Sequence, residues 1–359
     1  NDSIIGCTMN SGYYNTCIVG NSGGANTGNY LNNCHVADFY FYGIYCYYQN
    51  GVVISNNLVD RPTRTTLSTF YGIYILTGNT NALVEKNRIR NPFGASPGNA
   101  GTAYAIYSSI DGTAGNENRY YNNVISNMES NGIVGGLYLT GADYVKVHHN
   151  TISLDHAGAT SGTTYGIFNS GTVGGIDIRN NIVTITRGGS GTKYCLYYSL
   201  ASIVSNKNVL YLNSPAGVNY TGYFSGLTYA SLANWQTANG NLFDQQSSAA
   251  NPLYFSPVTN DYTPTELSFN NLGDPVGVLT DITGFARSGV TPDPGAYEYA
   301  NAALDIAVTA LNAPGNSGCY AANQNVVITI QNSGIQPIDF TLNPVTVTCN
   351  VTGALVATV

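Results

Sequence analysis

Short apolar runs interrupted by a pair of polar residues recur along the first two thirds of the chain. The clearest copy is VVISNNLVD at residues 52–60, where apolar residues flank two asparagines. Seven copies of this asparagine motif occur, at residues 31–36, 52–60, 84–89, 120–125, 147–152, 178–183 and 204–210. A second motif, an aliphatic residue followed by an aromatic one, has Ile44, Ile73, Ile106, Leu137, Ile167 and Leu196 at its centre, spaced 29, 33, 31, 30 and 29 apart. Two motifs that repeat in step indicate one structural unit per period.

A period of about thirty residues without helical spacing predicts an all-β solenoid. We expect a right-handed parallel β-helix with three strands in each turn. The aliphatic–aromatic motif forms one strand, and the runs on either side of the asparagine pair form the other two. Asparagine suits the corner because it tolerates left-handed backbone and its amide can bond the turn above or below. The asparagines expected to form a ladder there are Asn57, Asn87, Asn123, Asn150 and Asn181.

Strand alternation predicts which side chains of this coil point outward. Since Ile73 and its equivalents face the core, the aromatic residues that follow them face solvent. These candidate ligand-binding residues are Tyr45, Tyr74, Tyr107, Tyr138, Phe168 and Tyr197. Exposed rings with polar tips suit contact with glycans or with another protein, although stacking of like residues alone also accounts for such a column. A second series, expected to seal a corner of the coil, comprises Tyr42, Tyr71, Tyr104, Tyr165 and Tyr194.

The pattern changes twice after the coil, which we place at residues 1–227. Residues 228–299 are predicted to cap its end, with a short helix over Ser231–Gly240 that carries Trp235, followed by an extended tail. Residues 300–359 alternate as β-strands, at 305–309, 325–330 and 345–348. This part resembles the opening of an immunoglobulin-like β-sandwich and is too short to complete one. We therefore expect the chain to be part of a longer multi-domain protein.

Composition narrows the classes of partner. Charged residues make up 9% of the chain and the net charge is −7, which argues against a nucleic-acid-binding surface or a basic membrane contact. No apolar run reaches the roughly eighteen residues of a transmembrane helix, so no membrane insertion is expected. The chain opens at Asn1 without an initiating methionine or a leader-like segment, which favours a processed or excised piece.

The cysteine count is odd, at seven, so at least one thiol is unpaired within the chain. Cys7 and Cys34 fall one turn apart and either form a bridge or merely pack together. Cys319 and Cys349 lie in the last domain and are candidates for a disulfide across a β-sandwich.

Candidate catalytic residues are few. Glycoside hydrolysis normally uses two carboxylates, and lyase chemistry uses a base with a cation or an arginine. Asp111 and Asp143 follow the aliphatic–aromatic strands of adjacent turns, with Lys146 close by, and the alternative is that both aspartates bond to their own loops. No cysteine or histidine cluster suggests zinc, so no cofactor is expected, although loops near Asp274 and Asp281 leave structural calcium open.

The cap region carries four consecutive motifs: SLANWQ at 231–236, NPLYF at 251–255, DITGFAR at 281–287 and DPGAYE at 293–298. In this order they resemble the terminal region of secreted bacterial right-handed parallel β-helix repeat proteins, and the resemblance spans residues 1–299. It implies an extracellular or bacterial cell-surface protein of the kind that is often large, multi-domain and exported by type IX secretion.

Two classes of function follow from these observations. Pectate lyases and polygalacturonases share the expected fold, but the paired-Asp and Gly-His-Gly signatures of the hydrolases and an arginine motif of the lyases are not found. We therefore expect a non-catalytic surface protein or adhesin whose β-helix face contacts a glycan or another surface protein. The alternative is a polysaccharide-degrading enzyme, a lyase or a glycoside hydrolase, with its site on the same face.

Overall fold

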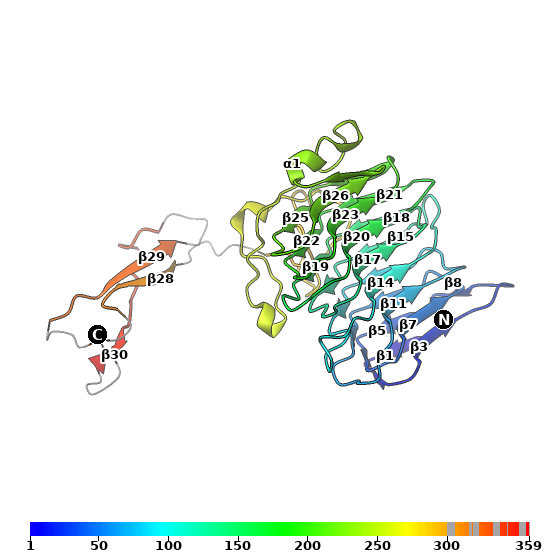
Figure 1. Ribbon diagram of the computed structural model, residues 1–359, viewed down its shortest axis with the longest axis horizontal. Helices are drawn as coiled ribbons and strands as arrows, with labels where there is room; N and C mark the ends of the chain where they lie inside the picture. The colour runs from blue at the N-terminus through cyan, green and yellow to red at the C-terminus, as the bar shows by residue number, and fades with distance from the viewer. Residues whose placement is uncertain are drawn as a thin grey trace. The chain divides into compact units, whose positions relative to one another are not determined.

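The computed structural model describes residues 1–299, 306–315, 318, 323–332, 338–342, 344–351 and 357–358 (Figure 1). The chain divides into two compact units, Asn1–Tyr299 and Ala300–Val359. Each unit is described by itself.

The first unit is a parallel β-solenoid of about 8 turns, which confirms the all-β, parallel β-helix prediction. Its turns place strands in three parallel sheets, and strands of successive turns pair in register (Figure 1). The first sheet contains β1 (Ser3–Ile5), β5 (Tyr30–Asn32), β9 (Val53–Ser55), β12 (Leu83–Glu85), β15 (Asn118–Tyr121), β18 (Val145–His148), β21 (Ile176–Arg179) and β24 (Ile203–Asn206). The second contains β2 (Thr8–Asn10), β6 (His35–Ala37), β10 (Leu58–Asp60), β13 (Arg88–Ile89), β16 (Val124–Ile125), β19 (Thr151–Leu154), β22 (Ile182–Ile185) and β25 (Val209–Leu212).

The third sheet holds the aliphatic–aromatic strands. It contains β3 (Tyr14–Val19), β7 (Tyr42–Tyr47), β11 (Phe70–Ile75), β14 (Ala103–Ser108), β17 (Val134–Leu139), β20 (Thr164–Asn169), β23 (Lys193–Tyr198) and β26 (Asn219–Phe224), with β27 (Leu227–Tyr229) added antiparallel at the end. A short pair, β4 (Asn26–Thr27) and β8 (Gln49–Asn50), joins the first loops.

The asparagine pair forms the corner between the first and second sheets. The first residue of the pair has left-handed backbone, as at Asn56 (φ 56°) and Asn180 (φ 58°), a conformation that asparagine adopts at low cost. The second residue is buried and points along the coil. At Asn57, both the backbone N and Nδ2 donate to Asn87 Oδ1, each at 3.0 Å, and this pattern repeats upward to Asn208. The predicted ladder is therefore confirmed.

The core lies inside the triangle of the three sheets, as the alternation predicted. Ile73 pairs with Ile44 below and Ile106 above, and none of the three side chains is exposed. The same position continues as Leu137, Ile167 and Leu196, also fully buried. Six aliphatic side chains in one column give the coil a continuous apolar interior.

A one-turn helix closes the end of the coil. Helix α1 (Leu232–Trp235) starts at Ser231, whose hydroxyl accepts a hydrogen bond from Asn234 N. Trp235 is fully buried and donates from Nε1 to Asp244 at 2.8 Å. The predicted helix is shorter than expected, because a left-handed residue, Asn239 (φ 50°), interrupts the turn of η1 (Ala238–Gly240).

The tail that follows packs on the outer side of the second sheet (Figure 1). It contains two short turns, η2 (Pro257–Thr259) and η3 (Leu267–Phe269). Tyr262 and Ile282 pack on Val124 of β16, and Phe269 packs on Ile182 of β22. Tail residues therefore cover part of the second sheet.

The second unit contains two small antiparallel sheets among its described residues, β28 (Ile306–Ala313) with β29 (Val327–Asn332), and β30 (Asn350–Val351) with β31 (Ala357–Thr358). The strand predicted at 345–348 is wrong, since those residues are not paired in a sheet. Cys319, one partner of the candidate disulfide with Cys349, lies outside the described residues. The immunoglobulin-like identity of this unit stays a prediction.

Candidate ligand-binding face

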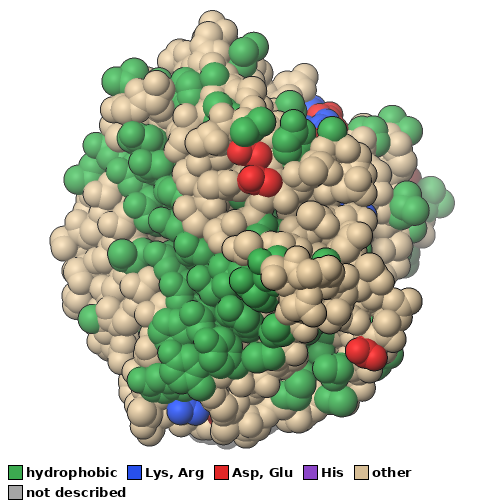
Figure 2. All heavy atoms as spheres, turned by 90° about the vertical axis from the view of Figure 1, so that its right-hand side faces the viewer, with side chains coloured by type: hydrophobic (Ala, Val, Ile, Leu, Met, Phe, Trp, Pro, Cys, Tyr) green, Lys and Arg blue, Asp and Glu red, His purple; other side chains and the backbone are tan. Residues whose placement is uncertain are grey.

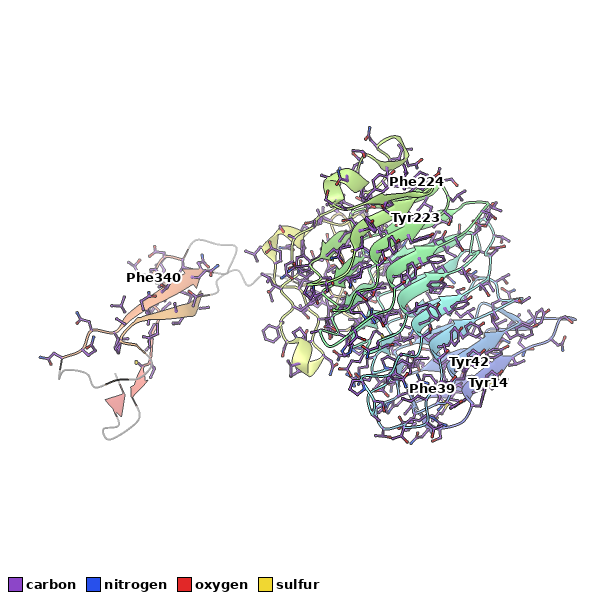
Figure 3. All side chains as sticks on the ribbon, viewed as in Figure 1. Tyr14, Phe39, Tyr42, Tyr223, Phe224 and Phe340 are labelled. Carbon is purple, nitrogen blue, oxygen red and sulfur yellow. The ribbon has the colours of Figure 1, made fainter. Side chains whose placement is uncertain are left out.

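Two parallel rows of aromatic residues cover the outer side of the third sheet, and we call them together the aromatic face. The first column consists of Tyr45, Tyr74, Tyr107, Tyr138, Phe168, Tyr197 and Tyr223. The second column consists of Tyr14, Tyr42, Tyr71, Tyr104, Tyr165, Tyr194 and Tyr220, with Gly135 in place of a ring on β17. Figure 3 labels Tyr14 and Tyr42 at one end of this sheet and Tyr223 at the other. Apart from the exposed Tyr14, these rings are half-buried.

The second column does not seal a corner, so that prediction is wrong. On β11 the two consecutive residues Gly72 and Ile73 are both buried, and Tyr71 and Tyr74 on either side of them are half-exposed. Strict alternation would have put Tyr71 on the same side as Ile73. The alternation slips at the glycine, where an added Cβ would lie 2.5 Å from the carbonyl oxygen of Ala105. This slip places both tyrosines on one face.

The rings of the first column stack tightly in the half of the coil nearer helix α1, which we call the upper half. Ring centroids lie 4.2 Å apart for Tyr138 and Phe168, with the planes 4° apart, and 4.0 Å apart for Tyr197 and Tyr223, with the planes 7° apart. In the lower half, Tyr74 and Tyr107 are 5.0 Å apart and tilted by 47°. The faces of the upper rings are thus covered by one another, and their edges point to solvent.

The upper rings of the second column stand perpendicular to those of the first. The planes of Tyr165 and Phe168 differ by 75°, and those of Tyr194 and Tyr197 by 90°. Within the second column, Tyr165 is parallel to Tyr194 within 11° at a centroid distance of 5.6 Å. The two columns are therefore one interlocked surface.

The phenols of Tyr42, Tyr74 and Tyr104 stay protonated at ordinary pH. Burial, and after it the neighbouring phenols, raises the pKa values of Tyr42, Tyr74 and Tyr104 well above the usual range. Lys193, on β23 beside the second column, is buried and turned inward, and donates to the carbonyl oxygens of Gly189, Gly191 and Ala216. Figure 2, whose colouring counts tyrosine as hydrophobic, shows a continuous apolar band on one side of the molecule with few charged side chains near it.

The predicted catalytic residues hold loops. Asp143 is buried, and its carboxylate accepts hydrogen bonds from the backbone N–H groups of residues 172–174 at 2.9 to 3.0 Å. Asp111 lies next to it and accepts from Asp143 N at 2.9 Å. Lys146 lies on the first sheet and pairs with Glu117 at 3.3 Å. The structure thus brings the two aspartates together, but both bind loop backbone, and Lys146 is not beside them.

A polar cluster on the first sheet was missed by the sequence reasoning. His148 Nε2 lies 3.2 Å from Asp177 Oδ2, and Arg179 donates to the same carboxylate at 2.7 and 2.6 Å. Burial opposes ionisation of Asp177, yet the hydrogen bonds from Arg179, together with the nearby His148 ring, outweigh it and lower its pKa. The signal was the alternation within DIR at residues 177–179, which places both charges outward. Because His148 is 1% exposed, a ligand cannot reach its ring without rearrangement.

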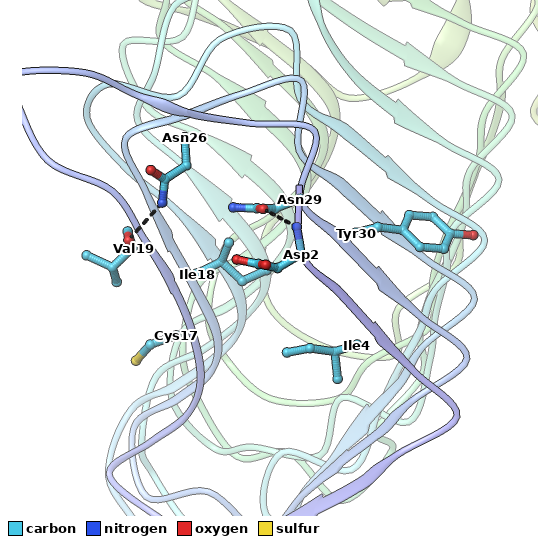
Figure 4. Close-up of a pocket in the computed structure, with 8 residues that line it drawn as sticks. All are labelled: Asp2, Ile4, Cys17, Ile18, Val19, Asn26, Asn29 and Tyr30. Atoms are coloured by element: carbon cyan, nitrogen blue, oxygen red, sulfur yellow. Dashed lines mark hydrogen bonds between the residues drawn. The ribbon is translucent and has the colours of Figure 1, made fainter.

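A small cavity lies at the N-terminal end of the coil (Figure 4). Its volume is about 200 Å³. It is lined by Asp2, Ile4, Cys17, Ile18, Val19, Asn26, Asn29 and Tyr30. Two hydrogen bonds, from Asn26 Nδ2 to Val19 O and from Asp2 N to Asn29 Oδ1, use part of its polar wall. This cavity is the open end of the core between β1 and β3.

Side chains that could bind a metal ion are dispersed over the described residues. Among the residues that the structure describes, no three His, Cys, Asp or Glu side chains gather as a metal-binding group. Asp281, in one of the two loops where calcium was left open, accepts hydrogen bonds from the N–H groups of Thr283, Phe285 and Glu298. Asp274, in the other, lies 3.7 Å from Arg179. Within the same described part, no helix is long and apolar enough to cross a membrane.

Comparison with known proteins identifies no relative: no family model, no curated protein and no solved structure matches this chain.

Proposed function

We propose that this protein is a non-catalytic carbohydrate-binding protein of the bacterial cell surface that uses the aromatic face to hold a glycan. The observation that carries this proposal is the column pair itself. Rings of the third sheet stay half-exposed over successive turns, whereas tail residues cover part of the second sheet. A large apolar surface that the protein's own chain leaves open is typical of a binding site.

The chemistry of the face favours sugar over protein as the ligand. Tyrosine combines an apolar ring, which packs on the C–H groups of a sugar, with a hydroxyl that can donate to or accept from sugar hydroxyls. The face repeats once per turn, and a polymer of like units can use a repeating surface many times over. A location outside the cell belongs to the same proposal, and the four tail motifs support it by resemblance to secreted proteins.

The non-catalytic part of the proposal rests on the acidic residues. Asp143 is buried and accepts three hydrogen bonds from backbone N–H groups, and Asp111 Oδ1 accepts one, so that both carboxylates have a structural role in holding loops. Lys146, on β18 of the first sheet, is paired with Glu117, which directly precedes β15 of the same sheet. The alternative, a polysaccharide-degrading enzyme, becomes the conclusion if incubation with a bound polysaccharide releases reducing ends or unsaturated products.

The test is binding to a polysaccharide panel, read by affinity electrophoresis and a glycan array. We expect the wild-type protein to bind at least one glycan without degrading it. A variant with Tyr107, Tyr165 and Tyr194 all changed to alanine, which removes rings from both columns and both halves of the face, should lose most of that binding, with its melting curve showing that the coil remains folded. A folded triple variant that binds as the wild type does, or a wild-type protein that binds none of the panel, contradicts the proposal.

A further inference from the structure

The proposed function leaves open where on the face a sugar lies and in which direction the polymer runs. We infer that an uncharged, unbranched polysaccharide lies along the axis of the coil on the ring faces of Tyr165, Tyr194 and Tyr220, one sugar per turn. This inference rests on the proposed function.

Ring orientation carries the argument. Upper rings of the first column are stacked from turn to turn at 4.0 to 4.8 Å, so their normals run roughly along the coil axis. Rings of the second column are turned by 75° to 90° from them, so their own normals run across the axis. Tyr165, Tyr194 and Tyr220 therefore form an offset-stacked row along the coil, called here the strip, with their ring faces turned across its axis.

The spacing within the strip supports this arrangement. Tyr165 to Tyr194 and Tyr194 to Tyr220 are both 5.6 Å between centroids, with the planes 11° and 24° apart. Offset-stacked rings lie about 4.5–7 Å apart between centroids, so each of these rings covers only part of its neighbour. One side of each ring meets the edges of the first column, which leaves the other side free of aromatic neighbours. Each of these rings is only partly buried, and a sugar can stack on the part of the ring that solvent reaches.

The strip ends where the second column is interrupted. Gly135 occupies the next position on β17, and an added Cβ there would lie 2.7 Å from Cδ1 of Tyr104, so that the Tyr104 ring leans into the place of the missing side chain. Below this point the pairs Tyr42–Tyr45, Tyr71–Tyr74 and Tyr104–Tyr107 are inclined by 69°, 48° and 62°, so the perpendicular order is less regular than in the upper half. The strip thus consists of three rings, one for each of three stacked sugars.

The absence of charge sets the ligand class. All three rings of the strip are phenols, and the ammonium group of the neighbouring Lys193 is turned inward on three carbonyl oxygens. A polymer of acidic sugars would bring carboxylates to a surface that offers no cation to pair with them. Linked six-membered sugar rings in an extended chain repeat at a spacing close to that of strands in a sheet, which matches one sugar to one turn.

The experiment is titration of the intact protein with neutral β-1,4-linked gluco- and manno-oligosaccharides from two to six units, and with oligogalacturonate of the same lengths, by calorimetry. Three variants locate the site. Tyr194→Leu keeps apolar bulk but removes the flat face, Tyr194→Phe keeps the face, and Tyr71→Leu makes the same change in the lower half of the column.

We expect affinity for a neutral oligosaccharide to rise up to the trimer and then level off. Tyr194→Leu should weaken trimer binding about tenfold, whereas Tyr194→Phe and Tyr71→Leu stay within about twofold of the wild type. Trimer binding that Tyr71→Leu weakens as much as Tyr194→Leu does, or a preference for oligogalacturonate, overturns the placement on the strip while leaving the proposed function intact. Failure of the wild type to bind any carbohydrate, on these probes and on the polysaccharide panel, overturns both.

Discussion

Removal of one amide from the middle of the asparagine ladder is the sharpest perturbation of the coil. Asn150 is fully buried, and its Oδ1 accepts from the backbone N of Asn123 at 3.0 Å and from Asn123 Nδ2 at 2.9 Å. Its Nδ2 donates to Tyr120 O at 2.8 Å and to Asn181 Oδ1 at 3.0 Å. Asn150→Ala therefore leaves two N–H groups of Asn123 without an acceptor in a region that water does not reach: the backbone N–H, and the one amide N–H that does not donate to Val84 O.

The magnitude follows from those two donors. A buried polar group left without a partner costs about 1–3 kcal/mol. The loss at Asn181 Oδ1 is smaller, because that oxygen still accepts from the backbone N of Asn150 at 3.0 Å. Counting the two donors alone, we expect Asn150→Ala to lower the free energy of unfolding by about 4 kcal/mol, a large share of the roughly 5–15 kcal/mol typical of a folded protein.

Urea unfolding measures this loss, followed by far-ultraviolet circular dichroism and by the fluorescence of Trp235. The two probes are needed because repeat arrays can unfold in steps, and Trp235 reports on the capped end alone. Asn116→Ala is the matched control, since this exposed asparagine should change stability by less than about 0.5 kcal/mol. If Asn150→Ala is no more destabilising than Asn116→Ala, the ladder contributes nothing measurable and the reasoning is refuted.

Three further predictions address the core, a buried cation and pH. Ile106→Ala should cost about 2–5 kcal/mol in urea unfolding as a core truncation, and a cost below about 0.5 kcal/mol would mean that the strand faces are inverted. Arg187 is fully buried and donates five hydrogen bonds, four of them to loop carbonyls, so Arg187→Met should lower stability by about 3 kcal/mol, and a neutral or stabilising result contradicts this. The neutral His149 ring donates to Asp293 O and accepts from Asn180 Nδ2, and burial, reinforced by Arg287, lowers its pKa well below the usual range. The pKa of His149 is lower in the folded than in the unfolded protein, so the stability that the neutral ring contributes is complete above about pH 6.5. It is lost as pH falls, at up to about 1.4 kcal/mol per pH unit. The difference in unfolding free energy between wild type and His149→Asn should therefore shrink from about pH 7 to about pH 5, and a constant difference contradicts the assignment.

The coil was predictable because its signals are local and repeat. Asn57 and its equivalents mark the corner of each turn in the sequence, and each side-chain amide bonds directly to the equivalent asparagine of the next turn. The second aromatic column was misplaced because the slip at Gly72 breaks alternation without changing the composition of the strand. Position in a repeat therefore predicts neighbours along the axis better than it predicts the side a residue faces.

The packing of the tail could not be predicted from the sequence. Contacts such as that of Arg287 with Asn122 join residues 165 positions apart, and nothing in either segment marks the other as its partner. Asp143 was ambiguous for a similar reason. A carboxylate at the start of a loop reads alike whether it serves a ligand or the backbone, and only the N–H groups of residues 172–174 around it distinguish the two roles.

The central claim is that the aromatic face holds a neutral glycan. The most direct test is hydroxyl-radical footprinting of the tyrosines with and without a neutral oligosaccharide, with the oxidised peptides identified by mass spectrometry. We expect the glycan to protect Tyr165, Tyr194 and Tyr220, while tyrosines elsewhere, such as Tyr211 on the second sheet, stay equally reactive. Unchanged reactivity of the three rings under saturating glycan, or protection confined to the loops around Asp111 and Asp143, would contradict it.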